Sequence, residues 1–263
     1  MTVRTFLVRG LIAGFVAGLL AFAVAHTVGE PPVDASIKIE EQGPAAAAEH
    51  DHEAGTSEHS HDEEEAVVSR ANQSTWGLLT ATVVLGAVFG GLVGLVSAFA
   101  TGRLGRLRPA ATSALVAAIG FGAYYLVPYL KYPPNPPAVG SPDTIGQRTA
   151  EYLTMVVISV VAAVAAVALA RTLIARHGGF VGSVVPALGF GVVVVLAGVL
   201  LPSIDEVPRT FPADTLWQFR LASLTTQATL WATIGVVLAG LLGRAHAAEE
   251  AKRERRALVG TAR

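Results

Sequence analysis

Six long apolar stretches constrain this chain more than any other feature of its sequence. A helix needs about 20 mostly apolar residues to cross the hydrocarbon core of a bilayer, and each stretch is long enough to do so. The sequence therefore predicts an all-α, polytopic integral membrane protein, a single membrane domain over residues 1–263 with six transmembrane helices arranged as three hairpins. The predicted helices cover approximately residues 6–28, 76–101, 109–130, 152–173, 180–201 and 221–242.

Composition limits the chemistry that such a protein can perform. Hydrophobic residues make up 52% of the chain and charged residues 15%, whereas a soluble domain carries about 25% charged residues. The sequence has no cysteine, which excludes thiolate zinc sites, iron–sulfur clusters, disulfides and cysteine nucleophiles. Any metal ion must therefore be bound by His, Asp, Glu or backbone oxygen.

The charged residues indicate the orientation in the membrane, because Lys and Arg are retained on the cytoplasmic side. A cytoplasmic amino terminus places most of the 19 basic residues inside. It also places all but three of the 20 acidic residues outside. Both termini are then cytoplasmic, and residues 247–263 form a charged cytoplasmic tail. The inner basic residues are Arg4, Arg9, Arg103, Arg106, Arg108, Arg171, Arg176, Arg244, Lys252, Arg253, Arg255, Arg256 and Arg263.

A cleaved signal peptide is an alternative interpretation of the first stretch. Arg4 and Arg9 would form its basic region, and the small residues around Ala23 would form the cleavage site. The apolar stretch is longer than the 7–15 residues usual for such a peptide, which favours a retained helix. The later helices keep their orientation in either case.

Histidines and carboxylates gather in residues 43–65, a low-complexity segment without apolar periodicity. Such a segment cannot bury enough apolar surface to fold alone, so it is predicted to be a flexible outer loop. Imidazole nitrogens among carboxylate oxygens suit divalent zinc, cobalt or nickel. The loop is therefore a candidate collector of metal ions, and a solvated acidic loop with incidental histidines is the alternative. Its candidate ligands are His50, His52, His59 and His61.

His26 and Glu30 form the second candidate site. They are four residues apart near the outer end of the first predicted helix, so they share one face if the helix extends that far. Ionisable groups at membrane depth often mark a substrate path. His26 alone is equally well explained as an interfacial residue bonded to a neighbouring carbonyl. The remaining outer carboxylates either complete an ion entrance or keep their loops hydrated, and they are Asp143, Asp205, Glu206 and Asp214.

Three further patterns predict helix contacts and loop structure. Gly14 with Gly18, and the glycines at 86, 90 and 94, have the spacing of a close helix contact, although incidental lipid-facing glycines give the same spacing. Tyrosines at 124, 125, 129 and 132 are predicted to form an aromatic belt at the lipid interface. Asp143-Thr144 and Asp214-Thr215 each precede a returning helix, so each is a candidate cap and the two hairpins are a candidate repeat.

Several function classes lack their sequence motifs. No Gly-rich loop ending in Gly-Lys-Ser or Gly-Lys-Thr is present, and no His-Glu-x-x-His or Gly-x-Ser-x-Gly element occurs. The basic tail is short and contains glutamates, so it gives no reason to expect a nucleic-acid partner. The chain is predicted to be neither a nucleotide-binding protein nor an enzyme, and to hold no permanent cofactor.

Three segments resemble the CbtA family of predicted cobalt transporter subunits. They are the opening helix with His26 and Glu30-Pro31, the loop LVPYLKYPPNPPAVGSPDTIGQRTAEY at 126–152, and FPADTLWQFRLASL at 211–224. The resemblance implies cobalt uptake across the bacterial inner membrane, linked to cobalamin synthesis. It also implies a small single-helix partner that bears histidines, CbtB.

The combined prediction is a membrane subunit of a divalent-metal importer. Cobalt is the favoured substrate, and nickel and zinc are the alternatives. The outer His/Glu loop would collect the ion, and His26 with Glu30 would receive it in the helix bundle. A membrane scaffold or metal-sensing subunit that does not transport is the alternative.

Overall fold

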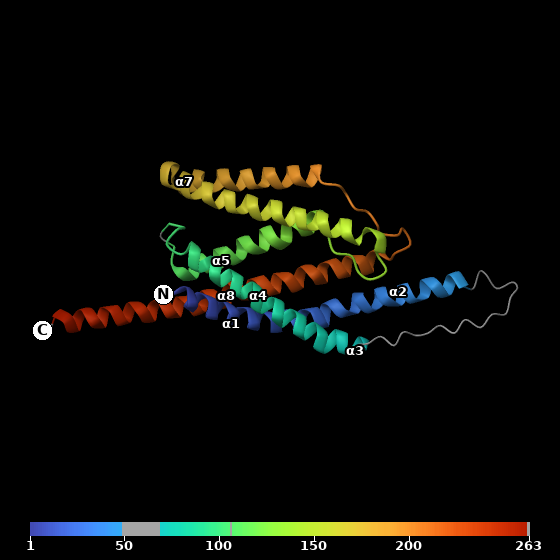
Figure 1. Cartoon of the computed structure of the whole chain (residues 1–263), viewed down its shortest axis with the longest axis horizontal. Coiled ribbons are helices and arrows are strands. Elements are labelled where there is room, and N and C mark those ends of the chain that lie inside the picture. The colour runs from blue at the N-terminus through green and yellow to red at the C-terminus, as the bar shows by residue number, and fades with distance from the viewer. Residues whose placement is uncertain (49–68, 106, 262–263) are drawn as a thin grey trace.

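The computed structural model describes the backbone of residues 1–48, 69–105 and 107–261, and every regular element in these ranges is a helix (Figure 1). The first elements are α1 (Val3–Val24), the π-helical turn η1 (Ala25–Gly29), α2 (Glu30–Ala48), α3 (Arg70–Asn72), a second π-helical turn η2 (Gln73–Gly77) and α4 (Leu78–Ala100). They are followed by α5 (Pro109–Gly120), a third π-helical turn η3 (Phe121–Leu126), α6 (Val127–Lys131), the 3-10 turn η4 (Pro142–Thr144), α7 (Ile145–Leu200) and α8 (Ala213–Thr261).

Among the described residues, five helices are long and apolar enough to cross a membrane. They are Val3–Gln42, Arg70–Ala100, Pro109–Lys131, Pro142–Leu200 and Ala213–Leu258. The prediction of an all-helical chain with membrane-length apolar helices is confirmed. The number of crossings stays a prediction, because α7 contains two of the six predicted segments.

A sharp bend divides α7 into two arms. Gly178 at the bend has φ 82° and ψ 172°, a backbone conformation that a residue with a Cβ rarely adopts. The chain doubles back there, so that Gly182 on the second arm closely contacts Ile174 on the first. Figure 1 shows the two arms running alongside each other from this bend.

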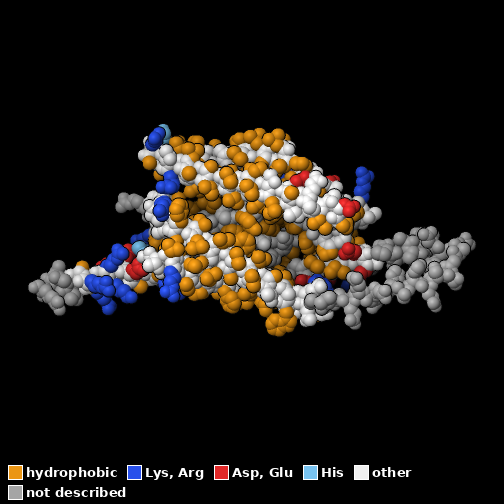
Figure 2. All heavy atoms as spheres, in the orientation of Figure 1, with side chains coloured by type: hydrophobic (Ala, Val, Ile, Leu, Met, Phe, Trp, Pro, Cys, Tyr) orange, Lys and Arg blue, Asp and Glu red, His pale blue; other side chains and the backbone are white. Residues whose placement is uncertain are grey.

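The bundle has two chemically different ends. The N-terminus, the 101–108 connection and the bend of α7 lie at one end, and α2, α3 and the connections before η4 and before α8 lie at the other (Figure 1). Lys and Arg gather at the first end, whereas Asp and Glu gather at the second, with hydrophobic side chains covering the surface between (Figure 2). We call these the basic end and the acidic end.

Glycines hold α1 and α4 in very close contact. A Cβ on Gly14 would lie closer than 3.0 Å to the backbone of Gly86, and a Cβ on Gly10 would approach the Gly90 carbonyl oxygen as closely. Gly18 lies against the backbone of Thr82 in the same way. The predicted close contact is confirmed, and the alternative of lipid-facing glycines is wrong for this row.

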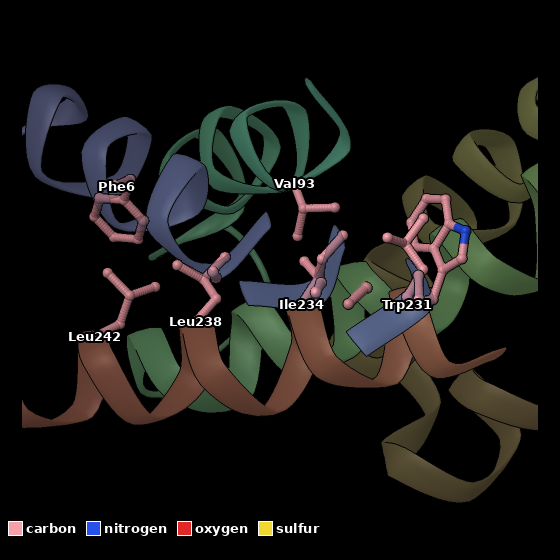
Figure 3. Close-up of a cluster of buried hydrophobic side chains, with 11 residues drawn as sticks. Phe6, Val93, Trp231, Ile234, Leu238 and Leu242 are labelled. Carbon is pink, nitrogen blue, oxygen red and sulfur yellow. The ribbon is translucent and has the colours of Figure 1, made fainter. Parts of the chain in front are cut away.

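The main apolar core lies where α8 packs against α1 and α5, with residues of α4 beside them. Ile234, Leu238 and Leu242 of α8 are fully buried, and they point toward α1 and α4 together with Trp231 (Figure 3). Phe6 and Val93 close the core from α1 and α4. Larger residues of α8 thus fill the space beside the small residues of α1, among them Ala13 and Ala17.

We expect Gly14→Ala to destabilise the bundle, because the added methyl group meets the Gly86 backbone, which cannot move aside as a flexible side chain can. Overpacking of this kind costs about 1–3 kcal/mol. The measurement is the midpoint of thermal unfolding in detergent. Gly198→Ala is the matched control, since a Cβ there has no neighbour within 4 Å. An equal midpoint for the two variants would contradict the contact.

Candidate functional site

The first helix extends well beyond the membrane-length stretch and places His26 and Glu30 on one continuous rod. Pro31 and Pro32 follow directly after the π-helical turn η1 and do not end the helix. Proline removes a backbone donor and clashes with the carbonyl four residues earlier. In a π-helical turn the backbone bonds join residues five apart, so the carbonyls opposite the prolines do not need their usual partners. The helix therefore continues past Glu30, which is the condition for His26 and Glu30 to share a face.

The ring of His26 contacts the π-helical turn η2, which precedes α4. Its Nδ1 lies 3.0 Å from the carbonyl oxygen of Ser74. A carbonyl only accepts, so Nδ1 must carry the hydrogen in this contact. In the neutral ring, Nε2 then holds a lone pair that can bind a metal ion. The ring also stacks on Phe22, with centroids 5.5 Å apart.

The π-helical turn η2 accounts for the availability of the Ser74 carbonyl. In an α-helix this oxygen would accept the N–H of residue 78. Here the N–H of Leu78 bonds instead to the carbonyls of Gln73 and Thr75. Two irregular turns, η1 and η2, thus meet through the bond from His26 to Ser74.

Glu30 is paired with an arginine. Arg70 donates from Nη2 to Glu30 Oε2, and it also donates to Asp34 Oδ1 from Nη2 at 2.9 Å and from Nε at 3.2 Å. Glu30 is the more buried carboxylate, with 15% of its side chain exposed against 53% for Asp34. One guanidinium therefore contacts two carboxylates of α2 and offsets the charge of only one of them. The roles of Arg70 and Asp34 were missed at the sequence level, although Asp34 continues the four-residue spacing of His26 and Glu30.

These polar contacts continue the register of the glycine contact. Gly10 lies against Gly90, Gly14 against Gly86 and Gly18 against Thr82. Each step of four residues along α1 is matched by a step of four back along α4. The same steps bring His26 to Ser74 and Glu30 to Arg70. We call His26, Glu30, Asp34, Arg70 and Ser74 the outer cluster.

The described residues do not assemble a complete metal site. Within them, no group of three or more His, Asp or Glu side chains could hold a metal ion together. His50, His52, His59 and His61 lie outside the described residues. Asp143, Asp205 and Asp214 are exposed at the acidic end and are not brought into one cluster.

A second polar cluster joins the loop 132–141 to the connection before α8 and to α8 itself. Arg220 donates to the Asn135 side chain at 2.9 Å and to the Pro134 carbonyl at 3.4 Å. Arg148 donates to the Ser141 carbonyl at 3.1 Å and lies 3.5 Å from Glu206. Glu206 also accepts from the backbone N–H of Ser141 at 3.1 Å. We call this set of contacts the loop cap.

Gly140 makes the close packing of Arg148 possible. Its φ of 112° is unfavourable for any residue with a Cβ. A Cβ there would also collide with the Arg148 guanidinium. The prolines and the glycine of this loop therefore serve to shape a backbone on which Arg148 lies.

Three of the four tyrosines of this region form hydrogen bonds within the protein. Tyr125 is buried, and its hydroxyl lies 2.9 Å from that of Ser223. Tyr129 donates to the Arg220 carbonyl at 3.0 Å, and Tyr132 donates to the Pro202 carbonyl at 2.8 Å. The predicted belt is therefore wrong for Tyr125, which is buried, and stays a prediction for the half-buried Tyr129 and Tyr132. Tyr124 alone of the four is exposed.

The predicted capping by Asp143 is also corrected. The Ser141 hydroxyl caps η4 by accepting the N–H of Asp143 at 3.3 Å, and Thr144 precedes α7 without a side-chain cap. Asp214 lies in the first turn of α8, where a carboxylate is favoured by the helix dipole. The predicted repeat of an Asp-Thr cap is therefore not present before α7.

The comparison with protein families covers nearly the whole chain. The family described as probable cobalt transporter subunit (CbtA) matches residues 3–243. The chain belongs to the CbtA family. No curated protein and no solved structure matches it.

The matched residues of the CbtA family include both polar clusters. They run from the start of α1, through the outer cluster and the loop cap, into α8. The family description is that of a transporter subunit, so it supports an integral membrane protein with cobalt as the transported ion. It states neither a mechanism nor a partner.

The Glu206 contacts predict a pH dependence. The hydroxyl of Thr144, together with the Ser141 N–H and the Arg148 guanidinium, lowers the pKa of Glu206 below its usual 4.5. A carboxyl group whose pKa is lower in the folded than in the unfolded state stabilises the fold at a pH above its unfolded-state pKa. This stabilisation is lost as the pH falls through the folded-state pKa. We therefore expect Glu206→Gln to unfold more readily than the original protein at pH 7, and the difference to shrink as the pH falls below 4.5.

The measurement is thermal unfolding in detergent as a function of pH. Asp205→Asn is the matched control, because Asp205 is an exposed carboxylate in the same connection. A difference between Glu206→Gln and the original protein that does not change below pH 4.5 would show that the Glu206 charge adds nothing to the loop cap.

Proposed function

We propose that this chain is the membrane subunit of an importer of divalent transition metals, with cobalt as the first substrate and nickel or zinc behind it. Six segments would cross the bacterial inner membrane, the two arms of α7 counting as two. The basic end and both termini would face the cytoplasm. Support comes from membership of the CbtA family and from the segregation of Lys and Arg to one end.

The observation that carries the proposed path is the hydrogen bond from His26 to Ser74. It orients the ring and leaves Nε2 as the atom that can bind the ion, the arrangement in which proteins commonly use histidine as a metal ligand. Glu30 supplies a carboxylate four residues further along the same helix. In the proposed path the segment 43–65, which begins in the last turns of α2, collects the ion and passes it to His26 and Glu30.

In the metal-free state, the Arg70 guanidinium would occupy the position that the metal ion later takes beside Glu30. The guanidinium offsets one of the two negative charges of Glu30 and Asp34 until a divalent ion displaces it from Glu30. Since the described residues supply no third ligand group, the proposal takes further ligands from the loop histidines or from a small histidine-bearing partner helix. A membrane potential that is negative inside favours entry of the cation by about 2.3 kcal/mol per charge per 100 mV.

Uptake of labelled cobalt by cells that express the chain tests this proposal. The chain is expressed with and without a single-helix, histidine-bearing partner, and uptake is compared with cells lacking both. Accumulation that depends on this chain is expected in at least one case. Absence of uptake in both cases would favour the alternative of a scaffold or metal-sensing subunit.

We expect His26→Ala and Glu30→Ala each to lower cobalt uptake by at least about tenfold, since even residues behind a metal ligand cost 10–100-fold when removed. Deletion of residues 43–65 should lower uptake at low cobalt and leave it nearly unchanged at high cobalt, because a collector raises only the local concentration. His177→Ala is the control, an exposed histidine at the basic end. The reverse pattern would place the selective site in the loop.

We expect Arg70→Gln to strengthen the binding of cobalt, because the ion then no longer competes with a guanidinium for Glu30. The measurement is the dissociation constant of Co²⁺ for the purified protein. Arg209→Gln, which removes an exposed arginine from the same end, should leave the constant unchanged. Weaker binding in Arg70→Gln would mean that Arg70 positions the cluster and does not compete with the ion.

A further inference from the structure

A large apolar cavity lies between α7 and the α5–η3–α6 rod. Its volume is about 1430 Å³, which exceeds the 300–1,000 Å³ of a typical small-molecule site. Its walls come from the 102–107 connection, from α5, η3 and α6, and from both arms of α7. The cavity lies apart from the outer cluster, none of whose residues lines it.

The cavity exists because α7 contacts the rest of the described chain mainly near the acidic end. There Val127 of α6 is buried with Met155 and Ala197 of the two arms, and η4 and η3 also touch α7. Small residues, among them Ala163, Ala166 and Ala170, face the cavity from the first arm. They leave open the space between α5 and α7.

Among the described residues, four polar side chains line the cavity, and two of them already have hydrogen-bond partners. The Thr172 hydroxyl donates to the Ala168 carbonyl at 3.4 Å, and the Ser183 hydroxyl donates to the Gly179 carbonyl at 2.8 Å. The other two are Arg103 and Arg171, and none of the described residues that line the cavity is acidic. Both arginines belong to the basic end.

Both arginines have donors left for a ligand. Arg103 uses Nη1 to bond the Phe99 carbonyl at 2.7 Å and lies over the Phe99 ring, but a guanidinium has five N–H donors. Arg171 is exposed, seven residues before Gly178, which is about 10 Å along the helix from the bend. Two positive charges thus stand at one end of an otherwise apolar cavity.

We propose that this cavity binds an anionic phospholipid of the bilayer, with its phosphate at Arg103 and Arg171 and its acyl chains between α5 and α7. Apolar walls suit acyl chains, and basic pockets between membrane helices recognise anionic headgroups. A partner helix would need an acidic residue at the depth of Arg103 and Arg171, whereas a phospholipid carries its negative phosphate at the membrane surface. The lipid would complete the attachment of α7 to the bundle.

Native mass spectrometry of the purified chain tests this proposal. Phosphatidylglycerol or phosphatidylcholine is added in detergent, and the bound lipid is counted. We expect a preference for phosphatidylglycerol, and a loss of about 25-fold in its affinity in the double variant Arg103→Gln, Arg171→Gln, at about 1 kcal/mol per basic residue. The matched control Arg4→Gln, Arg244→Gln removes two exposed arginines of the basic end that do not line the cavity.

A second variant tests the acyl site independently of the charges. A Cβ on Gly122 has no neighbour within 4 Å, and Gly122 lines the cavity, so Gly122→Leu should fold and block the binding of phosphatidylglycerol. Equal binding of the two lipids, or full binding by the double variant, would overturn the proposal. So would a dimer that persists after removal of lipid and is abolished by Gly122→Leu, since a second copy of the chain would then occupy the cavity.

Discussion

The close contact between α1 and α4 determines where the polar groups of this protein lie. Side chains larger than hydrogen are excluded from the row of glycines at 10, 14, 86 and 90, so the two backbones touch and their register is set by shape. A slip by one turn would drive larger residues into this row. The same register, carried four residues at a time toward the acidic end, brings His26 to Ser74 and Glu30 to Arg70. A packing constraint deep in the bundle thus positions charged groups at its surface.

Much of the fold was predictable because the bilayer leaves few alternatives. Apolar runs long enough to cross it must be helical, since their backbone groups find no other partners there. The glycine spacing also correctly indicated a close contact. The register was not predictable, because a row of glycines says which faces meet but not which residues lie opposite one another. Arg70 was missed for that reason, since its partners precede it by about 40 residues and only the register brings them together.

The outer loops show a different limit of sequence interpretation. The stretch 126–152 carried the family resemblance, yet its residue types suggested a belt of tyrosines and an Asp143 cap. In the structure, Tyr129 and Tyr132 bond to backbone carbonyls far along the chain, that of Arg220 in α8 and that of Pro202 after α7. Local patterns miss such contacts because the carbonyl of any residue can serve as the acceptor. Only the packing of the helices decides which carbonyl each hydroxyl reaches.

The two polar clusters differ in a way that bears on transport. In the loop cap, Glu206 has one nearby guanidinium and additional neutral donors, so its charge is balanced and its contacts form part of the fold. In the outer cluster, one guanidinium serves two carboxylates, and this group keeps one unit of negative charge beside a histidine whose second nitrogen can accept a ligand. Since the charge of Glu206 in the loop cap is already matched, the excess of negative charge in the outer cluster is the feature on which the proposed ion path depends.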